Sequence, residues 1–195
     1  MSSASSKDVP RFTPEQYLAL ERKAESRSEF YDGFIEAMAG ASRAHGLISL
    51  NLASQLLRQL EDRPCEVYNG DMRVWVGPAN RYTYPDVVVV CGEPRFQDSD
   101  LDTLLNPTVI VEVLSPTTEQ QDRGKKFTGY RGLNSLKDYI LVDQDQVLVE
   151  QYTRDKDQWR LTIHDQHADT LHLASIGCEV PLRAIYARVI PPPKA

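Results

Sequence analysis

The most constraining feature of the chain is an apolar run that carries one acidic side chain. Residues 108–114 read Thr-Val-Ile-Val-Glu-Val-Leu, and the run is apolar at both odd and even positions around Glu112. A strand of this kind is typical of a sheet that is covered on both faces. An ionised carboxylate is costly to bury alone, so Glu112 requires a cation, a lysine or water at the end of the sheet. The run therefore predicts a central strand with a polar site beside it.

Hydrophobic periodicity in the rest of the chain predicts an α/β fold with a central mixed β-sheet flanked by helices. Helices are expected where apolar residues recur at helical spacing or capping-box sequences occur, over residues 13–24, 42–60, 118–133 and 182–186. Strands are expected where short runs alternate or are apolar throughout, over residues 28–31, 34–37, 66–68, 72–76, 84–90, 108–114, 138–142, 147–152 and 159–164. We expect the Asp32-Gly33 pair to close a hairpin and residues 92–106 to form a surface loop.

Length and termini exclude several classes of protein. The 195 residues suit a single domain, which we expect to occupy residues 12–190. Residues 1–11 are polar and predict a disordered lead-in instead of a secretory signal, and residues 191–195 form a proline-rich tail. The apolar runs are too short to span a bilayer, so no membrane partner is expected. The three cysteines are far apart and odd in number, which predicts a cytoplasmic protein with neither a zinc site nor a disulfide.

The net charge of -6 argues against a protein that coats nucleic acid or an anionic membrane non-specifically. The charge is uneven, because residues 1–116 carry 11 basic and 17 acidic side chains and residues 138–195 carry 6 and 9. Residues 117–137 carry 5 basic and 2 acidic side chains, a local charge of +3. Any contact with nucleic acid is therefore expected to be local and salt-sensitive.

A second carboxylate stands at the start of another apolar run. Asp86 follows Pro85 and precedes four consecutive valines. If the two strands are neighbours, Asp86 and Glu112 could converge on one divalent ion, and oxygen-only ligands favour magnesium or manganese. The alternative is that Asp86 caps its strand and Glu112 faces solvent from a sheet edge. The pattern alone leaves both readings open.

The helix expected after residue 118 offers a third group. Asp122, Lys126 and Tyr130 are four residues apart and share one face. Because a helix that follows a strand begins near that strand's C-terminal end, Lys126 could reach the carboxylates. A lysine there can orient a metal-bound water or stabilise a phosphoryl transition state. The plainer alternative is an exposed Asp122–Lys126 ion pair of little energetic weight.

These residues, taken in order, resemble one family. Its features here are Glu29-Phe30-Tyr31-Asp32-Gly33, Met38-Ala39-Gly40, His45, Pro85-Asp86, Glu112-Val113-Leu114-Ser115-Pro116, Asp122-Arg123-Gly124-Lys125-Lys126 with Tyr130, and the strand 138–143. The sequence is similar over residues 12–187 to the bacterial "Putative restriction endonuclease" family, a branch of the PD-(D/E)XK nuclease superfamily. The resemblance implies a restriction-endonuclease-like fold.

The resemblance also implies roles for individual residues. Asp86 and Glu112 match the metal-binding acids, and the backbone carbonyl of Val113 matches the position that completes the metal site. The chain departs from the superfamily pattern at Leu114, where a lysine is usual. In this branch the lysine is displaced to the following helix, where Lys126 is the matching position.

Four further residues fall on family positions or on the same helix face and are possible accessory groups, namely Glu29, His45, Asp122 and Tyr130. For His45 the family gives no clear role, and a lone histidine is more often a structural hydrogen-bonding residue. The implied activity is hydrolysis of DNA phosphodiester bonds by a magnesium-dependent endonuclease, with manganese as a substitute. A homodimer would suit cleavage of both strands. The alternative is a catalytically inactive nuclease fold that binds DNA or another protein, which the acidic total charge and Leu114 would favour.

Overall fold

The structure is a computed structural model that describes residues 11–116 and 118–189. The predicted proline-rich tail, and the predicted lead-in apart from Arg11, lie outside these residues. Within them, no helix has both the length and the apolar character that crossing a membrane would require.

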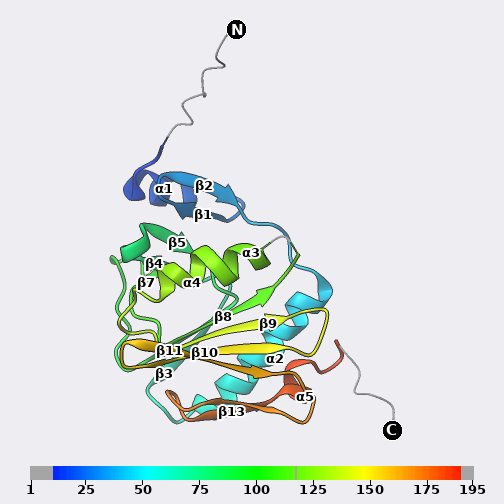
Figure 1. Cartoon of the computed structure of the whole chain (residues 1–195). Helices are drawn as coiled ribbons and strands as arrows, with labels where there is room; N and C mark the ends of the chain where they lie inside the picture. The colour runs from blue at the N-terminus through cyan, green and yellow to red at the C-terminus, as the bar shows by residue number, and fades with distance from the viewer. Residues whose placement is uncertain (1–10, 117, 190–195) are drawn as a thin grey trace.

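A six-stranded mixed sheet forms the centre of the molecule (Figure 1). Its strands, in spatial order, are β11 (Gln158–His164), β10 (Val149–Asp155), β9 (Asp138–Asp143), β8 (Val109–Leu114), β6 (Val87–Cys91) and β3 (Cys65–Asn69). Only β8 and β9 run parallel, because the helical segment after β8 crosses back over the sheet before β9 begins. Every residue of β8 is buried, as the apolar run predicts.

A smaller sheet packs above the first one and carries the N-terminal hairpin. Its strands, in spatial order, are β2 (Phe34–Ala37), β1 (Ser28–Tyr31), β5 (Arg81–Thr83), β4 (Arg73–Val76) and β7 (Thr103–Leu104). The turn between β1 and β2 places Asp32 and Gly33 at positive φ, 45° and 95°, as this residue pair allows. A separate two-stranded ribbon is formed by β12 (Thr170–Leu173) and β13 (Cys178–Pro181).

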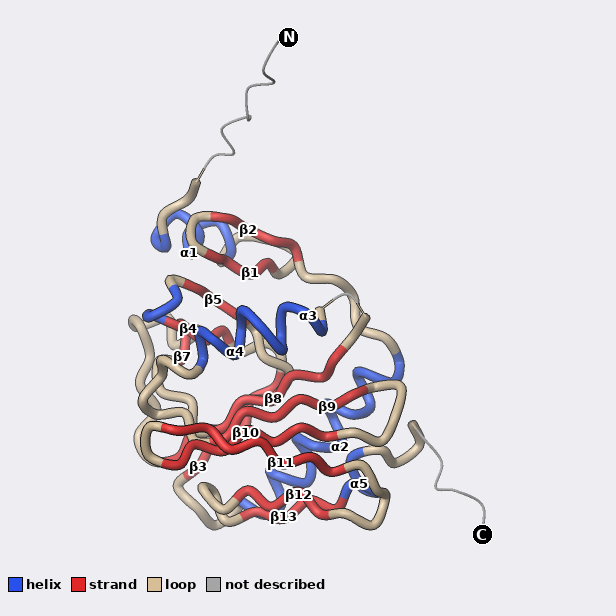
Figure 2. The backbone as a smooth tube through the Cα atoms, viewed as in Figure 1, coloured by secondary structure: helices blue, strands red, loops and turns tan. Residues whose placement is uncertain are grey.

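Helical segments lie on both faces of the central sheet and beside the smaller sheet (Figure 2). They are α1 (Pro14–Glu21), α2 (Arg43–Leu60), the 3₁₀ turn η1 (Gly77–Ala79), α3 (Glu119–Gln121), the π-helical turn η2 (Asp122–Lys126), α4 (Phe127–Tyr130) and α5 (Leu182–Ile185). One apolar face of α2, formed by Ile48, Leu52, Leu56 and Leu60, packs on one side of β6, β8 and β9. The segment from α3 to α4 lies on the other side, where Tyr130 packs near Val88, Ile110 and Tyr139.

Several expected boundaries are wrong. The run expected as one strand over residues 84–90 is interrupted, because Pro85 lacks a backbone donor and β6 begins only at Val87. The loop expected over residues 92–106 contains the short strand β7, which pairs with β4. The ribbon of β12 and β13 was not expected, since each strand has only 4 residues and so short an alternation does not separate a strand from a loop.

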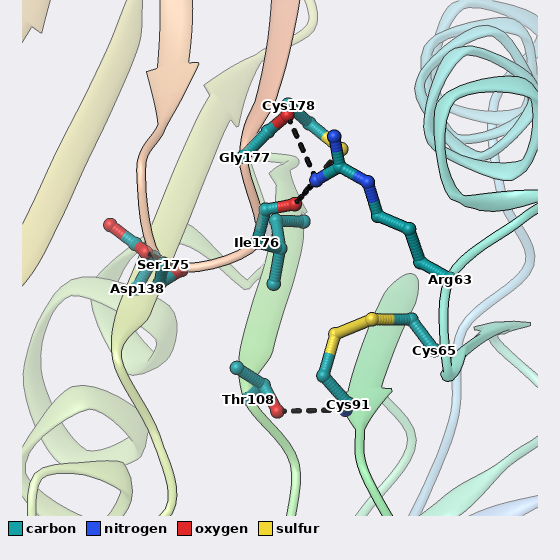
Figure 3. The surroundings of a disulfide bond; sticks show 9 residues. All are labelled: Arg63, Cys65, Cys91, Thr108, Asp138, Ser175, Ile176, Gly177 and Cys178. Carbon is teal, nitrogen blue, oxygen red and sulfur yellow. Dashed lines mark hydrogen bonds between the residues drawn. A yellow bond between two sulfur atoms is a disulfide. The ribbon is translucent and has the colours of Figure 1, made fainter.

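The prediction that the cysteines form no disulfide is also wrong. Cys65 and Cys91 are directly opposite one another on the antiparallel strands β3 and β6, with Cα atoms 4.0 Å apart, and they form a disulfide. Strand pairing brings them together across 26 residues of sequence, which spacing alone does not reveal. Beside this bond, the Arg63 guanidinium donates to the carbonyl of Ile176 at 2.6 Å (Figure 3). The third cysteine, Cys178, is buried and free.

Candidate functional site

Two carboxylates meet where β6 and β8 leave their paired region. The antiparallel register pairs Val87 with Val111, so one further step along both strands places Asp86 opposite Glu112. Residues opposite one another in such a pair direct their side chains to the same face of the sheet. Asp86 Oδ2 accepts a hydrogen bond of 2.7 Å from the backbone nitrogen of Val113, which fixes the aspartate against β8.

Lys126 extends from η2 into a set of three acidic side chains. Its Nζ lies 3.3 Å from Glu112 Oε1, 3.1 Å from Glu29 Oε1 and 3.2 Å from Asp122 Oδ1. Its side chain is only 8% exposed, and that of Glu112 4%. The exposed Asp122–Lys126 pair of the plainer reading is therefore wrong, because the pair is buried together with Glu112.

The helical segment that carries Lys126 is less regular than expected. Thr118 makes no side-chain cap, so the expected capping box is absent there. Residues 122–126 form a π-helical turn between two short α-helical segments. Such turns widen a helix locally and are frequent at functional sites. This turn keeps Asp122 and Lys126 in contact, while Lys125 is exposed.

Tyr130 and His45 each contact one of the two carboxylates: Tyr130 contacts Glu112, and His45 contacts Asp86. The Tyr130 hydroxyl lies 2.9 Å from Glu112 Oε1 and 2.9 Å from Thr83 Oγ1. His45, in the first turn of α2, places Nε2 3.3 Å from Asp86 Oδ1. Burial alone would lower the pKa of His45, but the hydrogen bond to Asp86 and the charges of Asp86 and Asp122 outweigh it and raise this pKa.

The cluster holds more acidic groups than basic ones. Burial raises the pKa of Glu112 well above its usual value; Lys126 opposes this effect, and Asp122, Asp86 and Glu29 add to it. Burial also raises the pKa of Asp122. For Lys126, burial acts to lower the pKa, but the three surrounding carboxylates raise it well above the usual value, so the ammonium stays charged.

A cavity of about 750 Å³ opens onto this cluster. Asp86, Glu112, Val113 and Lys126 line it. The lining also includes Ser42, which is the N-cap of α2, and the residues 37–41 before it.

Some residues that line the cavity were not expected from the sequence. Ser42 Oγ donates a hydrogen bond of 2.6 Å to Gln144, which follows β9. At the rim, Arg27 pairs with Asp71 at 2.9 Å and lies over the ring of Tyr84. Arg27 and Gln144 stand in polar segments between predicted elements, where no spacing or periodicity distinguishes them from ordinary loop residues.

The donors present suit a hard divalent cation. Among the described residues, no three histidine, cysteine or acidic side chains are arranged as a metal-binding group. Magnesium, however, is commonly bound by one or two carboxylates, with water and substrate phosphate filling the other positions. Asp86, Glu112 and Val113 line the cavity, and the two carboxyl groups offer oxygen donors of this kind among an excess of acidic side chains.

The structure thus brings the sequence-derived candidates into one region, although not all of them touch. Lys126 contacts Glu112, Glu29 and Asp122, and Tyr130 contacts Glu112. Asp86 is joined to this group through Val113 and is paired with His45. Within the described residues, no ion pair links Asp86 to Lys126 directly.

These observations define an α/β protein with a central mixed sheet, helices on both faces and an acidic cleft that contains a buried lysine. The fold matches the crystal structure of a putative nuclease belonging to DUF820 from Anabaena variabilis, with a TM-score of 0.75 and 18% identity, over 92% of this chain and 99% of that one. The chain belongs to the family described as "Putative restriction endonuclease" (Uma2), whose model matches residues 14–183. Family and fold together support a nuclease-type function.

Two relatives from Synechocystis sp. are similar over most of their lengths. The protein slr1290 is 36% identical over 186 residues, which are 95% of this chain and 97% of the relative. The protein sll1609 is 40% identical over 151 residues, which are 77% of this chain and 85% of the relative. Both are described as "Uncharacterized protein", so they add to the family assignment and not to the activity.

Proposed function

We propose that the chain is a magnesium-dependent DNA endonuclease whose catalytic residues are Asp86, Glu112 and Lys126. The observation that carries the proposal is the burial of Lys126 against Glu112 at the end of the central sheet, beside the Asp86 carboxylate. A buried cluster with excess acid is costly for stability alone, which favours a functional reason for it. A site that holds a cation would account for the excess.

In this proposal Asp86, Glu112 and the Val113 carbonyl hold magnesium, with manganese as a substitute. The cation supplies an activated water and a positive charge against the phosphate. His45 keeps Asp86 oriented, and Tyr130 fixes the Oε1 side of Glu112. These contacts leave the two carboxylates preorganised before a substrate arrives.

Lys126 has a separate part in the proposed reaction. Its charge is maintained by the surrounding acids, so it can stabilise the negative charge that develops on phosphorus oxygens or orient the attacking water. Glu29 and Asp122 hold the ammonium between two segments, β1 and η2. We propose DNA as the substrate and a homodimer as the form that cuts both strands.

The test is nicking of a supercoiled plasmid with and without magnesium. We expect the wild-type chain to nick only with the cation, and Asp86→Asn to lose nearly all activity. Lys137→Gln is the matched control, because Lys137 is exposed and precedes β9 at the end of β8 opposite to Glu112. Equal nicking by wild type and Asp86→Asn would refute the assignment of the site.

The second candidate function is a nuclease fold that has lost catalysis and binds DNA or protein. It is motivated by Leu114, which stands where the superfamily usually has its lysine, and by the acidic total charge. Calorimetric titration with manganese separates the two functions. Binding that Glu112→Gln abolishes favours the enzyme, whereas no binding at millimolar metal favours the inactive module.

A further inference from the structure

Next to the proposed catalytic site, one buried and one exposed cation lie around the same aromatic ring. Arg81 and Tyr31 are opposite one another on β5 and β1, and the guanidinium carbon lies 4.2 Å from the centre of the tyrosine ring. The Lys125 ammonium lies 5.6 Å from the same ring centre. We call Tyr31, Arg81 and Lys125 the Tyr31 cluster.

The charge of Arg81 is not balanced within the described residues. Arg81 is 4% exposed, and neither its Nε nor its Nη1 has a hydrogen-bond partner in this part of the chain. Arg81 and Lys125 also have no ion pair with a carboxylate there, whereas other arginines near this sheet do, such as Arg73 with Asp102. A buried cation without a counterion is unfavourable, and the arrival of an anion would offset part of that cost.

The Tyr31 cluster is continuous with the proposed catalytic site through two short connections. Along β1, Glu29 and Tyr31 are two residues apart and point to the same face, and Glu29 contacts Lys126. Along η2, Lys125 adjoins Lys126 but is exposed, while Lys126 is buried in the acidic cluster. β1 and η2 therefore place Tyr31 and Lys125 next to the acidic centre, and Arg81 reaches the same tyrosine ring from β5.

We propose that the Tyr31 cluster is a binding site for a DNA backbone phosphate that flanks the bond to be cut. Lys125 makes the contact at the surface, and Arg81 adds a fixed positive charge beneath it. The inference rests on the proposed DNA substrate but not on catalysis. It also gives a chain of net charge -6 a local contact for a polyanion, since Lys125 lies in the segment of charge +3 and Arg81 adds a cation from β5.

The experiment is fluorescence anisotropy of a labelled DNA duplex over a series of sodium chloride concentrations, with chelator present to prevent cleavage. The wild-type chain is compared with Lys125→Met, Lys125→Arg, Arg81→Met and the exposed control Lys137→Met. Loss of one phosphate contact lowers affinity about eightfold at 0.1 M salt and reduces the salt slope by about 1. We expect this loss for Lys125→Met, near-wild-type binding for Lys125→Arg and no change for Lys137→Met.

Three results would overturn the proposal: a wild-type chain that does not bind the duplex, an unchanged salt slope for Lys125→Met, or an equal loss for Lys137→Met. If Arg81→Met does not fold, the Lys125 pair of variants still decides the question. If the wild-type chain shows the expected salt dependence but nicks no plasmid, the endonuclease proposal fails and the phosphate site stands.

Discussion

Replacement of Lys126 by methionine is the perturbation that probes the acidic cluster most sharply. The substitution keeps the length of the aliphatic side chain but removes the cation that lies within 3.3 Å of three carboxylate oxygens. At an effective dielectric constant of about 20, one such contact corresponds to about 5 kcal/mol of Coulomb attraction. The cost of desolvating the ammonium and the repulsion among the carboxylates offset most of the summed Coulomb attraction of the three contacts. Removal of one partner of a buried ion pair typically costs about 3–5 kcal/mol.

We therefore expect Lys126→Met to lower the free energy of unfolding by about 3–5 kcal/mol, a large part of the roughly 5–15 kcal/mol typical of a domain. The assay is urea unfolding followed by circular dichroism at neutral pH. Lys125→Met is the matched control for stability, because Lys125 is the adjacent, exposed lysine, and its substitution should change the free energy by less than about 0.5 kcal/mol.

A double variant shows whether charge is the cause. Glu112→Gln in the Lys126→Met background removes one uncompensated buried carboxylate, so it should recover about 1–3 kcal/mol. Equal unfolding free energies for the wild-type chain and Lys126→Met would show that the Lys126 ammonium does not stabilise the acidic cluster. So would a double variant that is less stable than Lys126→Met alone, because the loss would then come from packing.

Two further predictions concern stability away from the site. Reduction of the Cys65–Cys91 bond opens a loop of 26 residues and should lower the free energy of unfolding by about 3.5 kcal/mol. Thermal melts with and without reductant measure this loss of stability. Three free thiols in the purified protein would contradict the presence of the disulfide. The hydrogen bond from Arg22, followed by that from Arg73, holds the pKa of Asp102 well below its usual value. The stabilisation it gives is therefore present above the unfolded-state pKa and is lost as the pH falls. Urea titrations between about pH 5 and pH 2 should show a shallower loss of stability for Asp102→Asn than for wild type, and parallel curves would contradict this.

The parts of the fold that the sequence predicts are those in which local pattern and tertiary environment agree. The leucine spacing of α2 and the doubly apolar run of β8 correspond to the faces that are buried. The capping box at Thr13 also forms, with its side chain accepting from the Gln16 nitrogen. At Thr118 the same kind of sequence makes no cap, because Thr118 has helical backbone angles (φ -110°, ψ -20°) where a capping residue is extended.

Other features depend on strand pairing, which local sequence does not encode. The Cys65–Cys91 disulfide follows from the register of β3 against β6, and the position of Asp86 opposite Glu112 follows from the register of β6 against β8. The contact of Glu29 with Lys126 requires the smaller sheet to pack above the helical segment. The resemblance to a family indicates Asp86, Glu112 and Glu29 from the sequence. Their distances from Lys126 depend on the packing of the two sheets, which the sequence pattern does not give.

The most direct test of the proposed site is the magnesium-dependent nicking rate of Lys126→Gln relative to Lys137→Gln, at protein concentrations at which both are shown to be folded. Removal of one preorganised group that stabilises charge in the transition state lowers the rate by a factor of about 10²–10³. We expect a loss of that size for Lys126→Gln and a wild-type rate for Lys137→Gln. A wild-type rate for folded Lys126→Gln would contradict it.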